Sequence, residues 1–308
     1  MQPHTPNVVV VGSLNMDLVT RTARRPERGE TLLGEAFDMF VGGKGLNQAI
    51  AAARQGAAVR MVGRLGADDF GRRLRQTMDA EGIDARHVAE DATTSSGIAT
   101  IVIDGKGDNS IIVVSGANGH VGPGDVERAA DVIAHADVLM LQLEVPLDAV
   151  LRAAQIARAA GVRVLLNPAP ARELPDELLR LVDVLTPNET ETQILTGLRI
   201  DDDASAARAA DALLGRGVGA AVLTLGARGA LLADGAQHRR IPGYSVEVVD
   251  TTAAGDAFCG ALAAQLGRGT PLAAAVRYAN AAGALATTVL GAEPAMPRLA
   301  AVEGLVEG

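Results

Sequence analysis

Short apolar runs alternate with amphipathic, alanine-rich segments along most of the 308-residue chain. Residues 8–11 are four consecutive valines, which is typical of a strand buried on both faces. Phe70, Leu74 and Met78 recur at the spacing of one helical face. The same reading predicts strands at 59–62, 138–143, 162–166, 184–186 and 221–225, and helices at 47–54, 147–160, 175–181, 189–195 and 204–214. This alternation predicts a doubly wound α/β fold, with a mostly parallel central sheet and helices on both of its faces.

Two segments interrupt the alternation. The apolar runs 97–103 and 110–115 are joined by a glycine- and aspartate-rich turn, which predicts a hairpin, and residues 18–40 are strand-like without a helical period. We expect residues 15–42 and 97–116 to form a small β-sheet lid over a ligand at the carboxyl ends of the main strands. After a strand ending at Val249 the chain is mainly helical. Since no linker interrupts it, we expect residues 1–308 to form a single domain.

Composition excludes several classes of function. Aromatic residues make up 2% of the chain, and 28 Lys and Arg against 37 Asp and Glu give a net charge of −9, so nucleic acid is not an expected partner. No run of 18 apolar residues and no signal peptide occur, so we expect no membrane partner and a cytoplasmic location. The single cysteine, Cys259, excludes an internal disulfide and is expected to be buried in a helix.

The first cluster of candidate functional residues follows the first strand, at 12–17. Asn15 and Asp17 are two residues apart, so they point to the same side of an extended segment. An amide and a carboxylate in that arrangement suit a ligand with several hydroxyl groups. The alternative is an ordinary turn, in which Asn and Asp are common.

A glycine-rich cluster at 42–47 precedes a predicted helix. Glycines allow the backbone to approach a ligand, and the helix start offers free N–H groups. It is not a Walker A loop, because Asp38 stands where that pattern needs glycine and Gly45 where it needs Ser or Thr. The alternative is a glycine-rich turn in which Asn47 caps the helix.

A third cluster, at 186–191, marks a strand-to-helix junction. Asn188 and Glu191 are three residues apart and share a face of the first helical turn, where they could hold a hydrated Mg²⁺ near phosphates. They also have the spacing of a capping box, and the two roles are compatible.

The fourth cluster, at 250–256, leads from a strand into an alanine-rich helix. The small residues Ala253, Ala254 and Gly255 leave backbone N–H groups open as an anion hole. Asp256 beside such a hole would repel a phosphate, unless it takes a proton from an attacking hydroxyl while the amides stabilise the phosphoryl group. The alternative is that Asp256 only complements the helix dipole.

The order of these clusters along one chain resembles the ribokinase family of ATP-dependent sugar kinases, from Val8 to about Pro297. Most similar are GGKGLNQA at 42–49 and LNPAPARELPDELLRLVDVLTPNETET at 166–192. The resemblance implies that ATP phosphorylates D-ribose at its 5-hydroxyl, giving D-ribose 5-phosphate and ADP. It also implies Mg²⁺ and K⁺ as cofactors and a homodimer formed through the lid.

The resemblance also implies a role for individual residues. Those matching sugar ligands are Asn15, Asp17, Gly43, Lys44, Asn47 and Glu144. Those matching nucleotide ligands are Asn188, Thr224, Gly226, Ala227, Gly229, Gly255 and Asn280. Asp256 matches the catalytic base, next to the anion hole of residues 253–255, and Glu191 matches a residue linked to Mg²⁺ through water. The matching monovalent-cation site comprises Asp250, Thr252, Ala286, Val289, Gly291 and Ala295, although relatives carry a hydroxyl where Ala295 stands.

Two alternatives to ribose phosphorylation remain. The first is a sister kinase acting on deoxyribose, another free sugar or a sugar phosphate. The second is a catalytically silent sugar-binding protein on the same fold, against which the intact Asp256 and the Asn188 and Glu191 pair argue.

Overall fold

A nine-stranded sheet forms the centre of the computed structural model, which describes residues 4–235 and 237–308. Its order is β13-β12-β11-β10-β9-β8-β1-β4-β5, and every neighbouring pair is parallel except β11–β12 and β12–β13. The strands are β1 (Asn7–Val11), β4 (Ala58–Gly66), β5 (Asp84–Asp91), β8 (Val138–Leu141), β9 (Arg163–Leu166), β10 (Val184–Leu185), β11 (Ala220–Thr224), β12 (Ala230–Asp234) and β13 (Gln237–Ile241). The mostly parallel sheet that the sequence predicted is confirmed.

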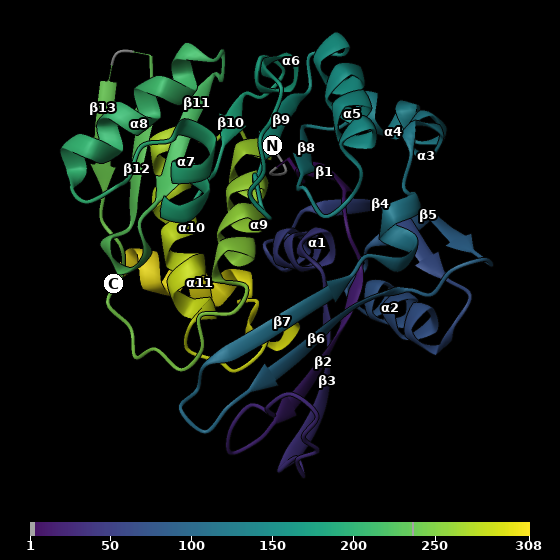
Figure 1. Ribbon diagram of the computed structural model, residues 1–308. Coiled ribbons are helices and arrows are strands. Elements are labelled where there is room, and N and C mark those ends of the chain that lie inside the picture. The colour runs from purple at the N-terminus through teal and green to yellow at the C-terminus, as the bar shows by residue number, and fades with distance from the viewer. Residues whose placement is uncertain (1–3, 236) are drawn as a thin grey trace.

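Helices cover both faces of this sheet (Figure 1). Val8 and Val10 of β1 point to one face, and Val9 and Val11 point to the other. The helices packed on the first face are α1 (Lys44–Arg54), α2 (Asp69–Ala80), α9 (Ala254–Gly267), α10 (Leu272–Ala286) and α11 (Leu299–Glu307). Those on the second are α3 (Pro123–Arg128), α4 (Ala130–Ala134), α5 (Leu147–Ala159), α6 (Asp176–Leu179), α7 (Glu189–Thr196) and α8 (Asp203–Gly215). All four valines are fully buried, as the unbroken apolar run predicted.

A separate four-stranded sheet stands off the main one, at the bottom of Figure 1. Its order is β3-β2-β6-β7, with β2 (Asn15–Arg21), β3 (Ala36–Gly42), β6 (Gly97–Ile103) and β7 (Asn109–Val114). The predicted hairpin is therefore β6–β7, and the strand-like segment before Phe40 supplies β2 and β3. We call these four strands the lid.

The order of the strands reverses beside β1. From β1 the chain continues to β4 and β5 on one side, whereas β8 begins the series that runs to β13 on the other. The segments that follow β1 and β8 therefore leave the sheet at a topological switch point, where open α/β sheets bind ligands. Gly12 to Asn15 follow β1, and Gln142 to Glu144 follow β8.

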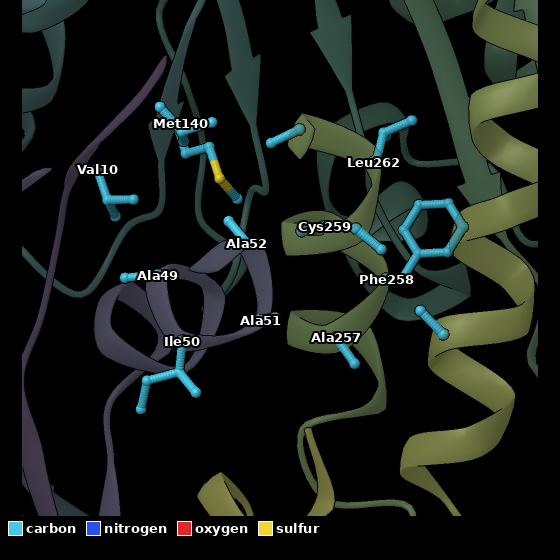
Figure 2. Close-up of a cluster of buried hydrophobic side chains, with 14 of the residues drawn as sticks. Val10, Ala49, Ile50, Ala51, Ala52, Met140, Ala257, Phe258, Cys259 and Leu262 are labelled. Carbon is cyan, nitrogen blue, oxygen red and sulfur yellow. The ribbon is translucent and has the colours of Figure 1, made fainter. Parts of the chain in front are cut away.

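Helices α1 and α9 pack unusually closely (Figure 2). A Cβ atom on Gly260 would lie 2.4 Å from the Ala51 Cβ and 2.6 Å from the Gln48 carbonyl oxygen, so only glycine fits there. Cys259, on the neighbouring position of α9, is buried as predicted, and its Sγ lies 3.3 Å from the Thr186 Oγ1. The close approach at Gly260 keeps Asp256, in the first turn of α9, within hydrogen-bond distance of Asn47 and Gln48 on α1.

The prediction of a strand ending at Val249 is wrong. The last strand before α9 ends at Ile241, and residues 242–253 form neither strand nor helix. The backbone amides of Val249 and Asp250 both donate to the Thr287 carbonyl, at 2.8 and 3.0 Å, so the segment is bonded to the end of α10 instead of to a sheet. Val248 and Val249 are about 60% exposed, so their apolar character does not reflect burial in a strand.

In the part of the chain that the structure describes, no helix combines the length and the apolar character needed to cross a bilayer.

Candidate active site

The two glycine-containing clusters near the N-terminus lie against each other at the switch point. The Ser13 Oγ donates to the Glu144 Oε2 at 2.5 Å, and the Lys44 amide donates to the same oxygen at 3.0 Å. A Cβ on Gly45 would lie 2.5 Å from the Ser13 amide nitrogen, which explains the glycine. Glu144 is therefore tied both to the loop after β1 and to the start of α1.

Helix α1 begins at Lys44, three residues before its predicted start. Its N-cap is Gly43, at a φ of +86°, a left-handed value that glycine adopts without strain. The alternative role of Asn47 as the cap is therefore wrong, because Asn47 lies within the helix and its side chain is free for other partners.

Asn15 and Asp17 lie on β2 and not in a turn, so that alternative reading is wrong as well. Asn15 is 3% exposed, and its Oδ1 accepts a hydrogen bond from the Asn118 Nδ2 at 2.7 Å. Burial, with smaller contributions from the Glu144 and Asp256 carboxylates, raises the pKa of Asp17 to about 7, while Lys44 opposes the shift. The lid thus contributes an amide and a readily protonated carboxyl to the site.

Asp256, in the first turn of α9, points at α1. Its Oδ1 accepts from the Gln48 Nε2 at 2.9 Å, and its Oδ2 accepts from the Asn47 Nδ2 at 3.2 Å. Burial raises the pKa of Asp256 above its ordinary value, although Lys44 and the two amide donors oppose the shift. The buried Asn47 Oδ1 has no hydrogen-bond donor among the described residues. An orphaned buried acceptor is costly, so a ligand hydroxyl is the group expected to satisfy it.

Lys44 is the cation of this cluster. Burial alone would lower its pKa, but the attraction of Asp256, Glu144 and Glu191 raises it, so the ammonium stays charged. One positive charge therefore offsets several neighbouring carboxylates. The site remains acidic overall, which suits hydroxyl groups better than a substrate phosphate.

The turn before α9 has the open backbone that the sequence suggested. Ala253 has a φ of +58° and is the only non-glycine residue with a positive φ in the described part of the chain. Such strain persists where the surroundings impose it, which is common at functional sites. A Cβ on Gly255 would meet no atom within 4 Å, so the space beside this backbone is open. The first N–H groups of α9 have no partner within the helix, although the Ala254 amide makes a long bond of 3.3 Å to the Thr251 carbonyl, and they can meet an anion there.

Asn188 and Glu191 form a reciprocal capping box at the start of α7. The Glu191 amide donates to the Asn188 Oδ1 at 2.8 Å, while the Asn188 amide and Nδ2 donate to the two Glu191 carboxylate oxygens at 2.8 and 3.0 Å. The capping role is thus confirmed. Each carboxylate oxygen keeps a further lone pair, so Glu191 can still accept from water bound to a Mg²⁺ ion. Burial raises the pKa of Glu191, and a nearby dication would favour its charged form.

The candidate nucleotide residues gather beyond the end of β11. Thr224 forms a parallel bridge with Asn188. Gly229, at a φ of +87°, lies against Gly243, since a Cβ on it would be 2.3 Å from the Gly243 amide nitrogen. The Asn280 Nδ2 donates to the carbonyls of Ile241 and Pro242, at 3.2 and 3.1 Å. The 3₁₀ turn η2 (Gly226–Arg228), which contains Gly226 and Ala227, completes this group.

Three of the predicted cation residues, Asp250, Thr252 and Gly291, come together. The Asp250 Oδ1 accepts from the Thr252 amide and Oγ1, at 2.9 and 2.7 Å, and its Oδ2 accepts from the Gly291 amide at 2.9 Å. Burial raises the pKa of Asp250, but these hydrogen bonds outweigh it and leave the pKa below its usual range. Ala286 ends α10, Val289 follows in the same connection, and Ala295 ends the 3₁₀ turn η3 (Glu293–Ala295). Backbone carbonyls and one carboxylate are oxygen ligands of the kind that fits a weakly hydrated monovalent cation.

Among residues 4–235 and 237–308, no group of three or more His, Cys, Asp or Glu side chains has metal-ligand geometry. Glu191 is the residue of the site that could contact a Mg²⁺ ion through water.

Sequence reasoning missed five polar residues that hold the site together. They are Ser13, Gln48, Asn118, Gln142 and Asn167, and all are buried. Gln142 gave one usable signal, because it is a lone polar residue within the apolar run 138–143. Gln48 gave another, since it stands among Leu, Ile and Ala in α1.

Comparison with known proteins agrees with this geometry. The pfkB family carbohydrate kinase profile matches residues 5–299. A ribokinase of Haemophilus influenzae is 41% identical over 94% of this chain and 95% of that protein, and a deoxyribokinase of Salmonella typhi is 37% identical over 95% and 96%. The structure of Arabidopsis thaliana ribokinase complexed with ribose and ATP superposes with a TM-score of 0.93, at 33% identity, covering 99% of this chain and 100% of that one.

The chain belongs to the pfkB family of carbohydrate kinases. It is therefore a phosphotransferase, and the predicted resemblance to ribokinases is confirmed over nearly its whole length.

Proposed function

We propose that this kinase transfers the γ-phosphoryl group of ATP to the 5-hydroxyl of D-ribose, giving D-ribose 5-phosphate and ADP. The observation that carries the proposal is the position of Asp256. Its carboxylate lies between the Asn47 amide, which has a free acceptor for a hydroxyl, and the open turn of residues 253–255. The ribokinase and the ribose-bound structure among its relatives support the choice of sugar.

On the sugar side, the side chains of Asn15, Asp17 and Glu144 accept hydrogen bonds from hydroxyl groups. Asn47 adds its free Oδ1, while Gly43 and Lys44 line the start of α1. Bound there, the 5-hydroxyl would face Asp256. These groups suit a neutral polyol and disfavour a second phosphate.

In the reaction, the Asp256 carboxylate takes the proton of the 5-hydroxyl while the oxygen of that hydroxyl forms a bond to the γ-phosphorus. The bond from that phosphorus to the bridging oxygen breaks, and its electron pair leaves with ADP. The backbone N–H groups at Ala254 and Gly255, after the Ala253 turn, stabilise the charge on the transferring group.

On the nucleotide side, Asn188, Thr224, Gly226, Ala227, Gly229, Gly255 and Asn280 would hold ATP. Glu191 would hold Mg²⁺ through water, and the ion would supply positive charge beside the phosphates of ATP. K⁺ would be held by the Asp250 carboxylate and by oxygens of Thr252, Ala286, Val289 and Gly291, with water in place of a hydroxyl at Ala295. It would keep the loop of residues 250–255 in shape.

The lid would close over the sugar and form the contact of a homodimer. Phe37 and Ile112, which the strand registers place on one face of the lid, are 59% and 68% exposed, and a small sheet is marginal in water unless its apolar face is covered. We place the enzyme in the cytoplasm, without a nucleic-acid or membrane partner.

Deoxyribose is the second candidate substrate, because the S. typhi deoxyribokinase is nearly as similar to this chain as the ribokinases are. The two sugars differ by one hydroxyl group. A site built to bond that hydroxyl would reject the sugar that lacks it.

A coupled ADP-release assay over ribose, deoxyribose, fructose and fructose 6-phosphate tests the proposal. We expect the highest kcat/KM with ribose and a far lower value with fructose 6-phosphate, because Asp17 and Glu144 repel its phosphate. Preference for deoxyribose would assign the second candidate. Binding of ribose without ADP release would identify a silent binding protein and overturn the proposal.

A further inference from the structure

Gln48, in the second turn of α1, engages both ends of its side-chain amide. Its Nε2 donates to the Asp256 Oδ1 at 2.9 Å and to the Asn167 Oδ1 at 3.1 Å, and its Oε1 accepts from the Gln142 Nε2 at 2.7 Å. The side chain is 1% exposed, so water does not compete for these bonds. Three distant parts of the chain therefore meet at one amide group.

The partners of Gln48 fix which way its amide points. The Asn167 Nδ2 donates to the Thr186 carbonyl at 3.0 Å, which leaves the Asn167 Oδ1 facing Gln48. Reversing the Gln48 amide would place its oxygen against the Asp256 carboxylate and its nitrogen against the Gln142 nitrogen. Both contacts are repulsive, so the N–H group stays aimed at Asp256.

We propose that Gln48 is a positioning residue for Asp256, held in place by Gln142 and Asn167. This inference rests on the proposed function, in which Asp256 is the base. Gln48 binds the Oδ1. Among the described residues the Oδ2 accepts only from Asn47, at a longer 3.2 Å, and it is then the oxygen that takes the substrate proton.

The charged and titratable groups around Asp256 come from several elements. They are Asp17 on β2, Lys44 on α1, Glu144 after β8, Glu191 on α7 and the Cys259 thiol on α9 itself. Removing Gln48 changes none of these charges. It removes one donor to the ionised carboxylate and so raises the pKa of Asp256 further.

The test is the pH dependence of kcat/KM for ribose in the Gln48→Met variant. Losing one hydrogen bond to a buried carboxylate is expected to move the acidic limb roughly one to two pH units higher. At a pH below that limb, kcat/KM falls about 10- to 100-fold, while KM for ATP stays within about threefold of the parent value.

Gln55→Met is the matched control. Gln55, the C-cap residue of α1, lies seven positions after Gln48 and is also 1% exposed. Its side chain donates to the Pro297 carbonyl and accepts from the Tyr278 hydroxyl, each at 2.7 Å. It does not contact Asp256, so its loss should leave the acidic limb where it is. An equal shift in both variants would mean that the packing of α1 alone is responsible, and would overturn the positioning role.

Gln48→Glu keeps the test decisive if the methionine variant does not fold. It places a second carboxyl against Asp256, and the pair would share a proton and move the acidic limb to higher pH still.

The Asp256→Asn variant separates the positioning role of Gln48 from the role of Asp256 as the base. If Asp256→Asn is inactive but the folded Gln48 variants keep the parent limb, only the positioning role is overturned. If Asp256→Asn is fully active, the proposed base is wrong and the positioning role falls with it.

Discussion

Replacing Gly260 with alanine should disturb catalysis through the contact between α1 and α9. The added Cβ would lie 2.4 Å from the Ala51 Cβ, 2.6 Å from the Gln48 oxygen and 2.7 Å from the Ala52 nitrogen. Two of these three atoms belong to the backbone of α1 and have no rotamer that relieves the contact. The helices must therefore separate.

The size of the effect follows from these distances. Carbon atoms pack best at about 3.5 Å or more, so the helices would have to separate by about 1 Å. Overpacking of this kind costs roughly 1–3 kcal/mol, against a gain of about 1 kcal/mol from the helix propensity of alanine. A displacement of about 1 Å at a catalytic group can lower kcat by roughly 100-fold. Asp256 lies one turn from Gly260 on α9, so we expect a loss of that order.

Gly304→Ala is the control, because a Cβ there would meet nothing within 4 Å and only the propensity gain remains. Urea unfolding gives the stability of both variants, and coupled ADP release with ribose gives kcat. We expect Gly260→Ala to be less stable than Gly304→Ala by roughly 1–3 kcal/mol and much slower. Equal stability and equal kcat in the two variants would refute the account of this contact.

Three further predictions concern pH, a cation and assembly. Burial together with Glu144 and Asp256 raises the pKa of Asp17 from 3.8 to about 7. The folded parent then keeps this proton at pH 5 and loses it by pH 8, whereas the unfolded chain has already lost it at pH 5. The free energy of unfolding of the parent should therefore fall by about 2–3 kcal/mol relative to that of Asp17→Asn as the pH rises from 5 to 8. A difference that stays constant with pH in urea unfolding would contradict this. KCl should activate the enzyme in Tris buffer at constant ionic strength, and Ala295→Ser should lower the KCl concentration required, whereas rates independent of KCl would remove the cation site. Ile112→Glu on β7 should turn a dimer into a monomer in light scattering, and a monomeric parent at micromolar concentration would contradict assembly through the lid.

The fold could be predicted because its signals are local. Four adjacent valines identify β1, and the 97–116 hairpin is evident from its turn residues. The polar strand β13, Gln-His-Arg-Arg-Ile, was not predicted, because only its last residue is buried and the segment has no apolar pattern. The false strand at Val249 had the opposite cause, since two exposed valines imitated a buried run.

Individual residues of the site could be proposed from their clusters, but their partners could not. Gln48 and Asp256 are 208 positions apart, and no periodicity relates them. Their contact depends on the close approach of α1 and α9 at Gly260, which is a property of packing in three dimensions. The reciprocal bonds of Asn188 and Glu191 are different, because a separation of three residues makes a capping box evident from the sequence.

The turnover of Asp256→Asn with ribose and ATP tests the central claim most directly. Asparagine preserves the size of the side chain but removes its ability to take a proton. We expect kcat to fall by roughly 10²–10⁴-fold, the contribution of a positioned general base, with unfolding in urea close to that of the parent. Near-normal turnover by the folded variant would contradict the assignment of Asp256 as the base.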